Sequence, residues 1–167
     1  QHAPLMAIKV LRPVSVSLGD ASAMLMPADT LSIAFEIDFD AAAIGRQTKS
    51  LDLANGAFLR ELCDSRTFCR LSDVEMMHEQ GLALGGTMEN AVVVDGDKVL
   101  TPGGLRHGDE AVRHKMLDAL GDLYTAGAPI LGRYVGHRAG HAVTNALLRE
   151  LFGNPLSFAR VPVDPAT

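Results

Sequence analysis

The stretch VRHKMLDALGDLYTAGA, at positions 112–128, constrains the fold more than any other part of the sequence. Its apolar residues recur at spacings of three and four, which is the pattern of a helix with one buried face. These residues are Val112, Met116, Ala119, Leu120 and Leu123, and the apolar surface is widened by Leu117 and Tyr124. The sequence therefore predicts a helix over 109–125 that has little surface free to face water.

The same helix carries His114, Asp118 and Asp122 at intervals of four residues. Positions four apart on an α-helix differ by about 40° around the axis, so these side chains form one narrow polar stripe. An imidazole and two carboxylates on a mostly buried helix need partners, water or a metal ion. Spacing alone favours a solvated stripe with a His–Asp ion pair over a metal or catalytic site.

Bulk composition excludes several classes of protein. At 167 residues, 47% of them hydrophobic, the chain is long enough for one domain with a substantial core or for two small domains. A net charge of −5 argues against a nucleic-acid-binding surface. No apolar run approaches the roughly 18–20 residues that span a membrane, and no signal peptide is recognisable.

The first residue and the cysteines add two expectations. Because the chain begins with Gln1 rather than Met, we expect a fragment or a processed product. The spacing of Cys63 and Cys69 fits neither a C-x-x-C motif nor a disulfide framework. We therefore expect reduced, mostly buried thiols in a cytoplasmic protein.

Strand patterns dominate the first part of the chain and helix patterns the last. β structure is predicted over 6–18, 21–27 and 31–39, and a short helix from about Asn55. A strand-like segment over 65–71 precedes a capping box, formed by Ser72 and Glu75, which opens a helix that Gly81 ends. The remaining predictions are β structure over 82–100, a strand from 129, a helix over 142–153 and a last strand over 156–163. This order indicates an α+β fold in which a sheet packs against helices.

Five short motifs in order carry a family resemblance: RTF at 66–68, GLALGG at 81–86, NAVVVD at 90–95, VRHKMLDALGDL at 112–123 and GHAVTN at 140–145. Together they resemble the C-terminal domain of UDP-3-O-acyl-N-acetylglucosamine deacetylase, a zinc enzyme of lipid A synthesis in Gram-negative bacteria. The resemblance covers nearly the whole chain. It implies a single two-layer α+β domain over residues 1–167, with an inserted β-α-β element at about 68–94.

The resemblance also implies roles for individual residues. His114 and Asp118 would be ligands of Zn²⁺, and His141 would be the catalytic histidine, oriented by Asp122. The nucleotide-sugar part of the substrate would be contacted by Lys115 and by Arg138, which stands where relatives commonly carry lysine. The acyl passage would be lined by Phe68, Leu71, Val74, Met88, Ala91 and Val93, the uridine end would meet Phe39 and Asp40, and Asp73 would lie near the diphosphate. Without the resemblance, ordinary core and surface roles are favoured for these residues.

Amide hydrolysis needs an activated water and a polarised carbonyl, and a zinc ion with three protein ligands and one open position supplies both. In the family, the first ligand and a general-base glutamate lie in an H-x-x-E-H motif of the N-terminal domain, which this sequence lacks. We therefore expect the C-terminal half of an enzyme acting on UDP-3-O-acyl-N-acetylglucosamine, with the missing N-terminal domain as its partner. Two alternatives stay open: a non-catalytic module that binds the acyl chain and nucleotide sugar, or a self-sufficient metal site of His114, Asp118 and His137 or His141.

Overall fold

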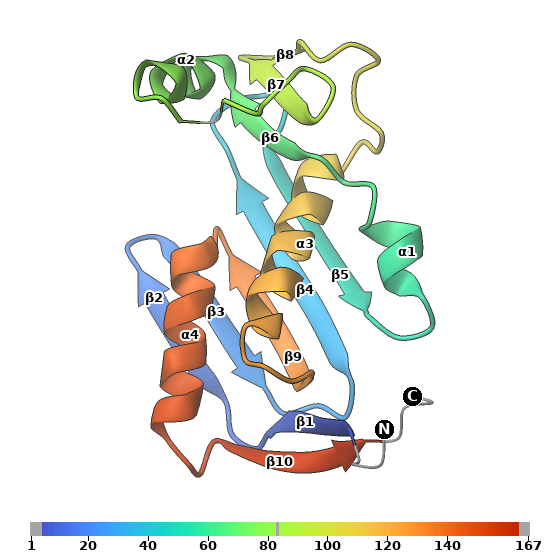
Figure 1. Cartoon of the computed structure of the whole chain (residues 1–167), viewed down its shortest axis with the longest axis vertical. Helices are drawn as coiled ribbons and strands as arrows, with labels where there is room; N and C mark the ends of the chain where they lie inside the picture. Colours follow the sequence, from blue (N-terminus) through green and yellow to red (C-terminus); the bar gives the residue numbers. More distant parts are fainter. Residues whose placement is uncertain (1–4, 83, 164–167) are drawn as a thin grey trace.

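The computed structural model describes residues 5–82 and 84–163, which form a large sheet, a small sheet and four helices (Figure 1). The central strand of the large sheet is β9 (Ile130–His137), which pairs in parallel with β1 and β4 and antiparallel with β3. The other strands are β1 (Leu5–Val10), β2 (Val14–Leu18), β3 (Ala21–Met26), β4 (Leu31–Asp38), β5 (Arg46–Asp52) and β10 (Phe158–Val163).

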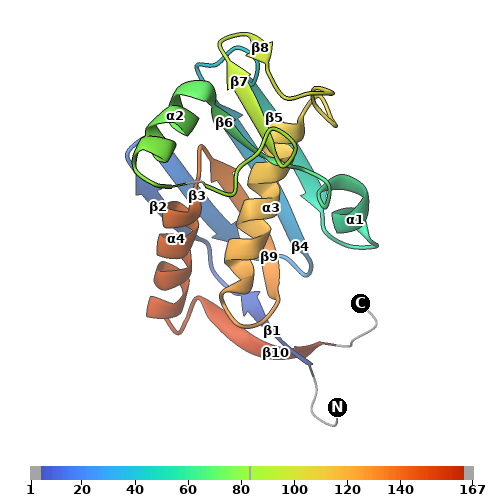
Figure 2. The same ribbon diagram turned by 45° about the horizontal axis from the view of Figure 1, so that its top comes forward.

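Two helices lie side by side on one face of this sheet: α3 (Glu110–Tyr124) and α4 (His141–Gly153) (Figures 1 and 2). The predicted apolar face of α3 is mostly buried there, at Val112, Met116, Ala119 and Leu123. The short helix α1 (Ala57–Glu61) follows β5. The two-layer α+β prediction is confirmed.

The inserted β-α-β element is also present. Strand β6 (Thr67–Arg70) runs parallel to β7 (Ala91–Asp95), helix α2 (Leu71–Glu79) lies between them in the chain, and β8 (Lys98–Val99) completes a small sheet. This element extends beyond the end of the large sheet where α3 begins (Figure 1). Thr67, at the start of β6, pairs with Ala91, at the start of β7. This pairing brings together the two ends of the segment that contains α2.

Four local predictions were wrong. The segment 6–18 is two strands, because the chain breaks at 11–13, where Pro13 has no backbone N–H to donate. Helix α2 begins at Leu71, directly after β6, so Ser72 lies within its first turn and does not cap it. Residues 84–90 form turns and irregular backbone, and β structure resumes only at Ala91. The thiol of Cys63 is exposed rather than buried, because it follows the surface helix α1, although both cysteines are free as expected.

Within the described residues, no helix has both the length and the apolar character needed to cross a membrane.

Gly136, on the central strand β9, lies tightly against two aromatic rings. A Cβ atom there would come within 2.8 Å of Phe35 Cε2 and 2.9 Å of Tyr134 Cε1. Both rings are buried and cannot swing into solvent. We therefore expect Gly136→Ala to lower the free energy of unfolding by about 1–3 kcal/mol, measured by urea denaturation. Gly153→Ala is the control, since no described atom beyond its own neighbours lies within 4 Å of the added Cβ; equal midpoints for the two variants would contradict the prediction.

Candidate active site

The stripe on α3 begins with a close pair formed by His114 and Asp118. Nε2 of His114 lies 3.2 Å from Oδ1 of Asp118, and its Nδ1 lies 3.3 Å from the backbone carbonyl oxygen of Ser65. A carbonyl only accepts hydrogen bonds, so Nδ1 carries a proton and Nε2 faces the carboxylate. Both side chains are partly exposed, at 16% and 19%. The pair therefore offers one nitrogen and one oxygen that solvent can reach, a donor set that suits zinc.

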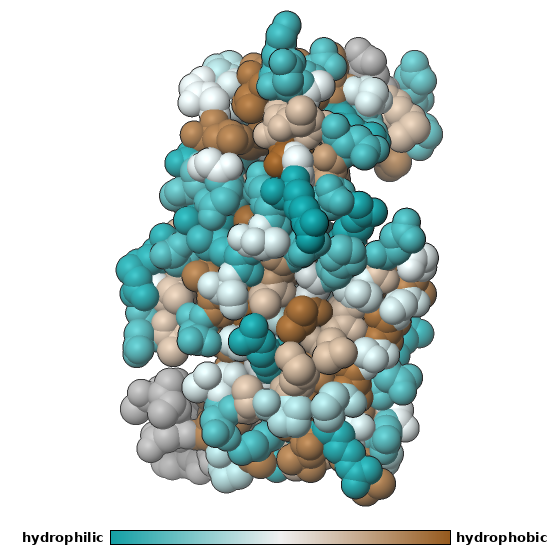
Figure 3. Space-filling view, turned by 180° about the vertical axis from the view of Figure 1, so that it is seen from behind, coloured by the Kyte–Doolittle hydropathy of each residue, from teal (hydrophilic) through white to brown (hydrophobic). Residues whose placement is uncertain are grey.

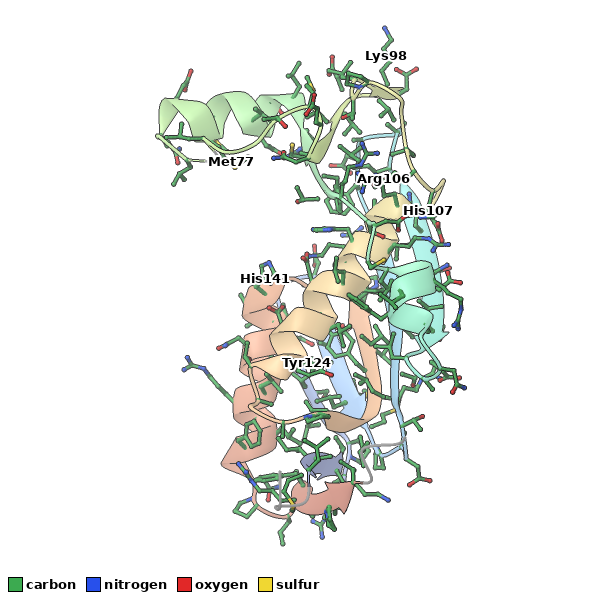
Figure 4. All side chains as sticks on the ribbon, turned by 45° about the vertical axis from the view of Figure 1, so that its right-hand side comes forward. Met77, Lys98, Arg106, His107, Tyr124 and His141 are labelled. Atoms are coloured by element: carbon green, nitrogen blue, oxygen red, sulfur yellow. The ribbon has the colours of Figure 1, made fainter. Side chains whose placement is uncertain are left out.

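The second pair lies one helical turn further along α3. Nδ1 of His141, the first residue of α4, is 2.9 Å from both carboxylate oxygens of Asp122. Asp122 accepts the Nδ1 proton, and Nε2 remains available to another group. His141 is 70% exposed and lies at the start of α4, next to α3 (Figure 4). It borders a groove of about 330 Å³ that Asp122, Thr125 and Asn145 also line.

The turn between β9 and α4 places His141 opposite Asp122. Arg138 has a positive φ of 49°, and its backbone N–H donates to the carbonyl of Glu36 on β4, at 2.9 Å. Gly140 is extended at the N-cap, and its carbonyl accepts the N–H groups of Val143 and Thr144. The chain thus reverses direction within a few residues and starts α4 with His141 in contact with Asp122, in the last turn of α3.

The two cationic residues predicted to contact the nucleotide sugar, Lys115 and Arg138, form ion pairs with carboxylates of the protein itself. Lys115 Nζ lies 2.8 Å from Oδ2 of Asp118 and is only 16% exposed, so it is not a freely solvated lysine. The guanidinium of Arg138 donates to Asp38, and this hydrogen bond lowers the pKa of the Asp38 carboxyl. A diphosphate would have to compete with Asp38 for Arg138.

The remaining acidic candidates lie near Arg70. Asp73 accepts two hydrogen bonds from this guanidinium, at 2.8 and 2.9 Å, which lower the pKa of Asp73. Asp40 is exposed and close enough to raise the pKa of both Arg70 and Arg138 through its charge. Asp40 and Asp73 therefore belong to one charged surface, and their contacts with substrate stay predictions.

The inserted element encloses an apolar cavity of about 510 Å³, called here the insert cavity. All six residues predicted for the acyl passage line it: Phe68, Leu71, Val74, Met88, Ala91 and Val93. The sequence did not indicate the other lining residues, which are Thr67, Cys69, Met77 (on α2, Figure 4), Gly86, Thr87 and Asn90. Burial raises the pKa of the Cys69 thiol.

Aromatic rings connect the insert cavity to the polar stripe. The rings of Phe39 and Phe68 meet edge to face, with their centroids 5.2 Å apart. Phe68 in turn packs edge-on against the imidazole of His114 at 6.1 Å. A ligand chain in the insert cavity would therefore end close to the His114–Asp118 pair.

A buried ion pair at the start of α3 was missed. Glu110 is 1% exposed, and its carboxylate accepts hydrogen bonds from the backbone N–H, Nε and Nη2 of Arg66 and from the backbone N–H of Arg106. Burial alone would raise the pKa of Glu110, but these hydrogen bonds lower it from 4.5 to about 2. No local pattern pairs these two residues, although Glu110 continues the four-residue spacing one step before His114 and Arg66 belongs to the RTF motif.

A self-sufficient metal site does not form among the described residues, where no three His, Cys, Asp or Glu side chains gather. His137 lies 3.3 Å from Glu36, and His141 contacts Asp122, so the structure does not bring either histidine to the His114–Asp118 pair. Any further ligand for that pair would have to come from outside the described residues.

A second apolar surface lies beside α3. This helix-side groove has a volume of about 620 Å³, and one of its lining residues is Tyr124, which is 58% exposed and is labelled in Figure 4. Its lining is Leu31, Leu53, Phe58, Leu117, Leu120, Gly121, Tyr124, Pro129, Ile130 and Leu131. The opposite face of the molecule shows polar and apolar side chains interspersed (Figure 3).

An α+β domain that presents one His–Asp pair on α3 and a second between α3 and α4, beside an apolar cavity, has the features of a candidate hydrolase domain for an acylated substrate. Residues 1–153 match the family model of LpxC, UDP-3-O-acyl N-acetylglycosamine deacetylase. The chain is also 52% identical over 155 residues to the UDP-3-O-acyl-N-acetylglucosamine deacetylase of Phenylobacterium zucineum (strain HLK1). That alignment covers 93% of this chain and 53% of the relative. The chain belongs to this deacetylase family, and it spans about half the length of the curated relative.

Proposed function

We propose that this chain is the C-terminal half of a zinc-dependent deacetylase that hydrolyses the N-acetyl group of UDP-3-O-acyl-N-acetylglucosamine in lipid A biosynthesis. Family membership supports the reaction and the pathway. The observation that carries the mechanism is the pair of His–Asp contacts on one face of α3. The two free cysteines support a reducing compartment, and we propose the cytoplasm.

His114 and Asp118 would hold the zinc ion. Their fit rests on the orientation of the imidazole, whose Nδ1 proton is donated to Ser65 so that its Nε2 faces Asp118. Bound there, zinc would supply an activated water and a polarised carbonyl. Lys115 would hold the second oxygen of Asp118 through its 2.8 Å ion pair and keep the carboxylate oriented.

His141 would serve as general acid and oxyanion stabiliser. With Nδ1 bound to Asp122, its Nε2–H can donate to the developing oxyanion and then to the leaving amine. Asp122 accepts the Nδ1 proton and so fixes the orientation of the ring. The 70% exposure of His141 leaves room for a substrate against this ring.

The rest of the protein would dock on the helix-side groove and supply the third ligand. This groove is apolar and adjoins α3, whose neighbouring face carries His114, Asp118 and Asp122. The alignment covers 93% of this chain but only 53% of the relative, so the relative has enough further sequence for a second domain. Docking on this side would cover the exposed ring of Tyr124 and close the site around His114 and His141.

Zinc binding tests the proposal directly. We expect the complete protein to bind one zinc ion and His114→Ala to lose it, because the substitution removes the nitrogen ligand from a three-ligand site. Metal content after dialysis is the measurement. His137→Ala is the control. This histidine pairs with Glu36 and is not a proposed ligand, so the variant protein should keep its zinc. Stoichiometric zinc in His114→Ala would refute the assignment.

The insert cavity would hold the acyl chain, and Met88 offers a direct test. Met88 is 41% exposed at the cavity, so arginine there can reach solvent and preserve the fold while its charge disfavours an acyl chain. We expect Met88→Arg to raise KM for the long-chain substrate by at least about tenfold, a cost of roughly 1.4 kcal/mol. Met24→Arg, a methionine of similar exposure (37%) on β3 and outside the cavity, should leave KM unchanged. Equal KM values for the two variants would show that the acyl chain does not bind in this cavity.

The alternative of a non-catalytic binding module rests on one observation. The insert cavity is lined entirely by this chain, whereas the described residues bring only two candidate ligands to the metal position. The isolated chain would then bind acyl chains without hydrolysing the amide. Upstream coding sequence in frame with an H-x-x-E-H segment would favour the half-enzyme over the module.

A further inference from the structure

One peptide group connects a buried carboxylate to the candidate metal ligand His114. The N–H of the Ser65–Arg66 peptide donates to Oε1 of Glu110 at 3.1 Å, and the carbonyl of the same peptide accepts from Nδ1 of His114 at 3.3 Å. In a planar trans peptide the N–H and C=O point in opposite directions, so a single group can bridge two partners. Glu110 and His114 are four residues apart on α3 and therefore lie on the same face of the helix.

The bridge has an electronic consequence as well as a geometric one. An N–H that donates to a carboxylate polarises its peptide and makes the attached carbonyl a better acceptor. That carbonyl holds a proton of His114 on Nδ1 and so fixes the ring with Nε2 3.2 Å from Asp118 Oδ1, where Nε2 would bind the metal. Histidines that bind metals generally donate their other N–H to a carboxylate or carbonyl, which orients the ring and raises its basicity.

Glu110 is itself held rigidly. Its carboxylate is 1% exposed, and it accepts further bonds from Nε and Nη2 of Arg66 and from the backbone N–H of Arg106. The Nη2 group of Arg66 also donates to the carbonyl of Gly104 at 2.8 Å, so the guanidinium cannot turn away easily. The hydroxyl of Ser65 is buried and has no hydrogen-bond partner among the described residues, so Ser65 acts here through its backbone.

We propose that Glu110 is a positioning residue for His114, which acts through the Ser65–Arg66 peptide to select the imidazole tautomer and to strengthen metal binding. This inference rests on the proposed function in one respect, the assignment of His114 as a zinc ligand. Glu110 is buried and would touch neither metal nor substrate. Its role is that of the carboxylate behind a metal-bound histidine, transmitted by one peptide group.

The test combines imidazole nitrogen NMR on the metal-free full-length protein with zinc affinity measured by chelator competition. In the parent, Nδ1 of His114 should carry a proton that is hydrogen-bonded to the Ser65 carbonyl. Glu110→Gln removes the charge with little change in shape, so we expect partial loss of this Nδ1–H hydrogen bond and about 10–100-fold weaker zinc binding.

Three variants separate this role from a structural one. Asp109→Asn removes a neighbouring carboxylate that contacts Lys49 and Arg113 instead of the bridging peptide, and should leave both readouts unchanged. Arg66→Lys removes the guanidinium contacts but keeps the peptide N–H, so it should lower stability while the His114 tautomer is retained. Ser65→Ala keeps the backbone bridge and should also preserve both readouts.

The outcomes are decisive for each claim. A parent-like Nδ1–H and zinc affinity in Glu110→Gln would overturn the inference, and so would an unprotonated Nδ1 of His114 in the parent, a measurement that needs no variant. If His114→Ala instead keeps the parent zinc affinity, the assignment of His114 as a zinc ligand fails. The NMR measurement on His114 in the parent and in Glu110→Gln still tests whether the Ser65–Arg66 peptide links Glu110 to His114.

Discussion

Replacing His141 by alanine in the complete enzyme is expected to lower kcat by about 10²–10⁴-fold, the usual contribution of a positioned general acid. The reason is the geometry at the start of α4, where Asp122 binds Nδ1 and leaves Nε2 to face a substrate. Steady-state hydrolysis of the acylated UDP-sugar, with metal analysis of the same samples, is the measurement. Zinc should remain bound, because His141 is not a ligand in this scheme.

Two variants sharpen that experiment. Asp122→Ala should reduce kcat less than His141→Ala, because it removes orientation and charge support but leaves the acid in place. His107→Ala is a matched control, since His107 also pairs with an aspartate, Asp64, at 2.9 Å, but lies at the far end of α3 from His141 (Figure 4). It should keep the parent kcat. Loss of zinc from His141→Ala would make His141 a ligand, and an unchanged rate would make it an ordinary surface histidine.

The second large effect concerns the buried ion pair at the start of α3. Glu110→Ala should lower the free energy of unfolding by about 3–5 kcal/mol, because it leaves the Arg66 guanidinium, 9% exposed, without its counter-charge. Urea denaturation of the chain measures the change. Asp109→Ala, which removes a partly exposed carboxylate one residue earlier, should cost no more than about 1 kcal/mol. Similar losses in the two variants would show that the buried pair contributes little.

The same ion pair makes the free energy of unfolding depend on pH in the acidic range. The folded-state pKa of Glu110 is about 2, below its ordinary value of 4.5, so the folded protein binds this proton less readily than the unfolded chain. The stabilisation is therefore complete above about pH 4.5 and is lost as the pH falls toward about 2. At 1.36 kcal/mol per pKa unit it amounts to roughly 3 kcal/mol. In Glu110→Gln, the free energy of unfolding should therefore fall less steeply between about pH 4.5 and 2 than in the parent. If the two proteins lose stability equally over this range, other carboxylates cause the acid sensitivity.

Local spacing determined much of the fold and of the site. The apolar face of α3 and the stripe of His114, Asp118 and Asp122 follow from helical periodicity, because residues four apart are neighbours whatever the rest of the chain does. Alternation of apolar residues likewise located most of the large sheet. The family resemblance named six residues for the acyl passage, and in the structure all six line the insert cavity.

Contacts between distant segments were decided only by the tertiary structure. Arg66 and Glu110 are 44 positions apart, and Arg138 and Asp38 are 100 apart, so no local pattern predicts either pair. The start of α2 at Leu71 was missed for a related reason, since pairing of β6 with β7 carries the chain to Arg70 and overrides the capping signal at Ser72. The backbone bridge from Glu110 to His114 is invisible in sequence, because any residue at position 65 supplies the same carbonyl. Side-chain periodicity is a property of one segment, whereas these contacts depend on how the folded chain brings separate segments together.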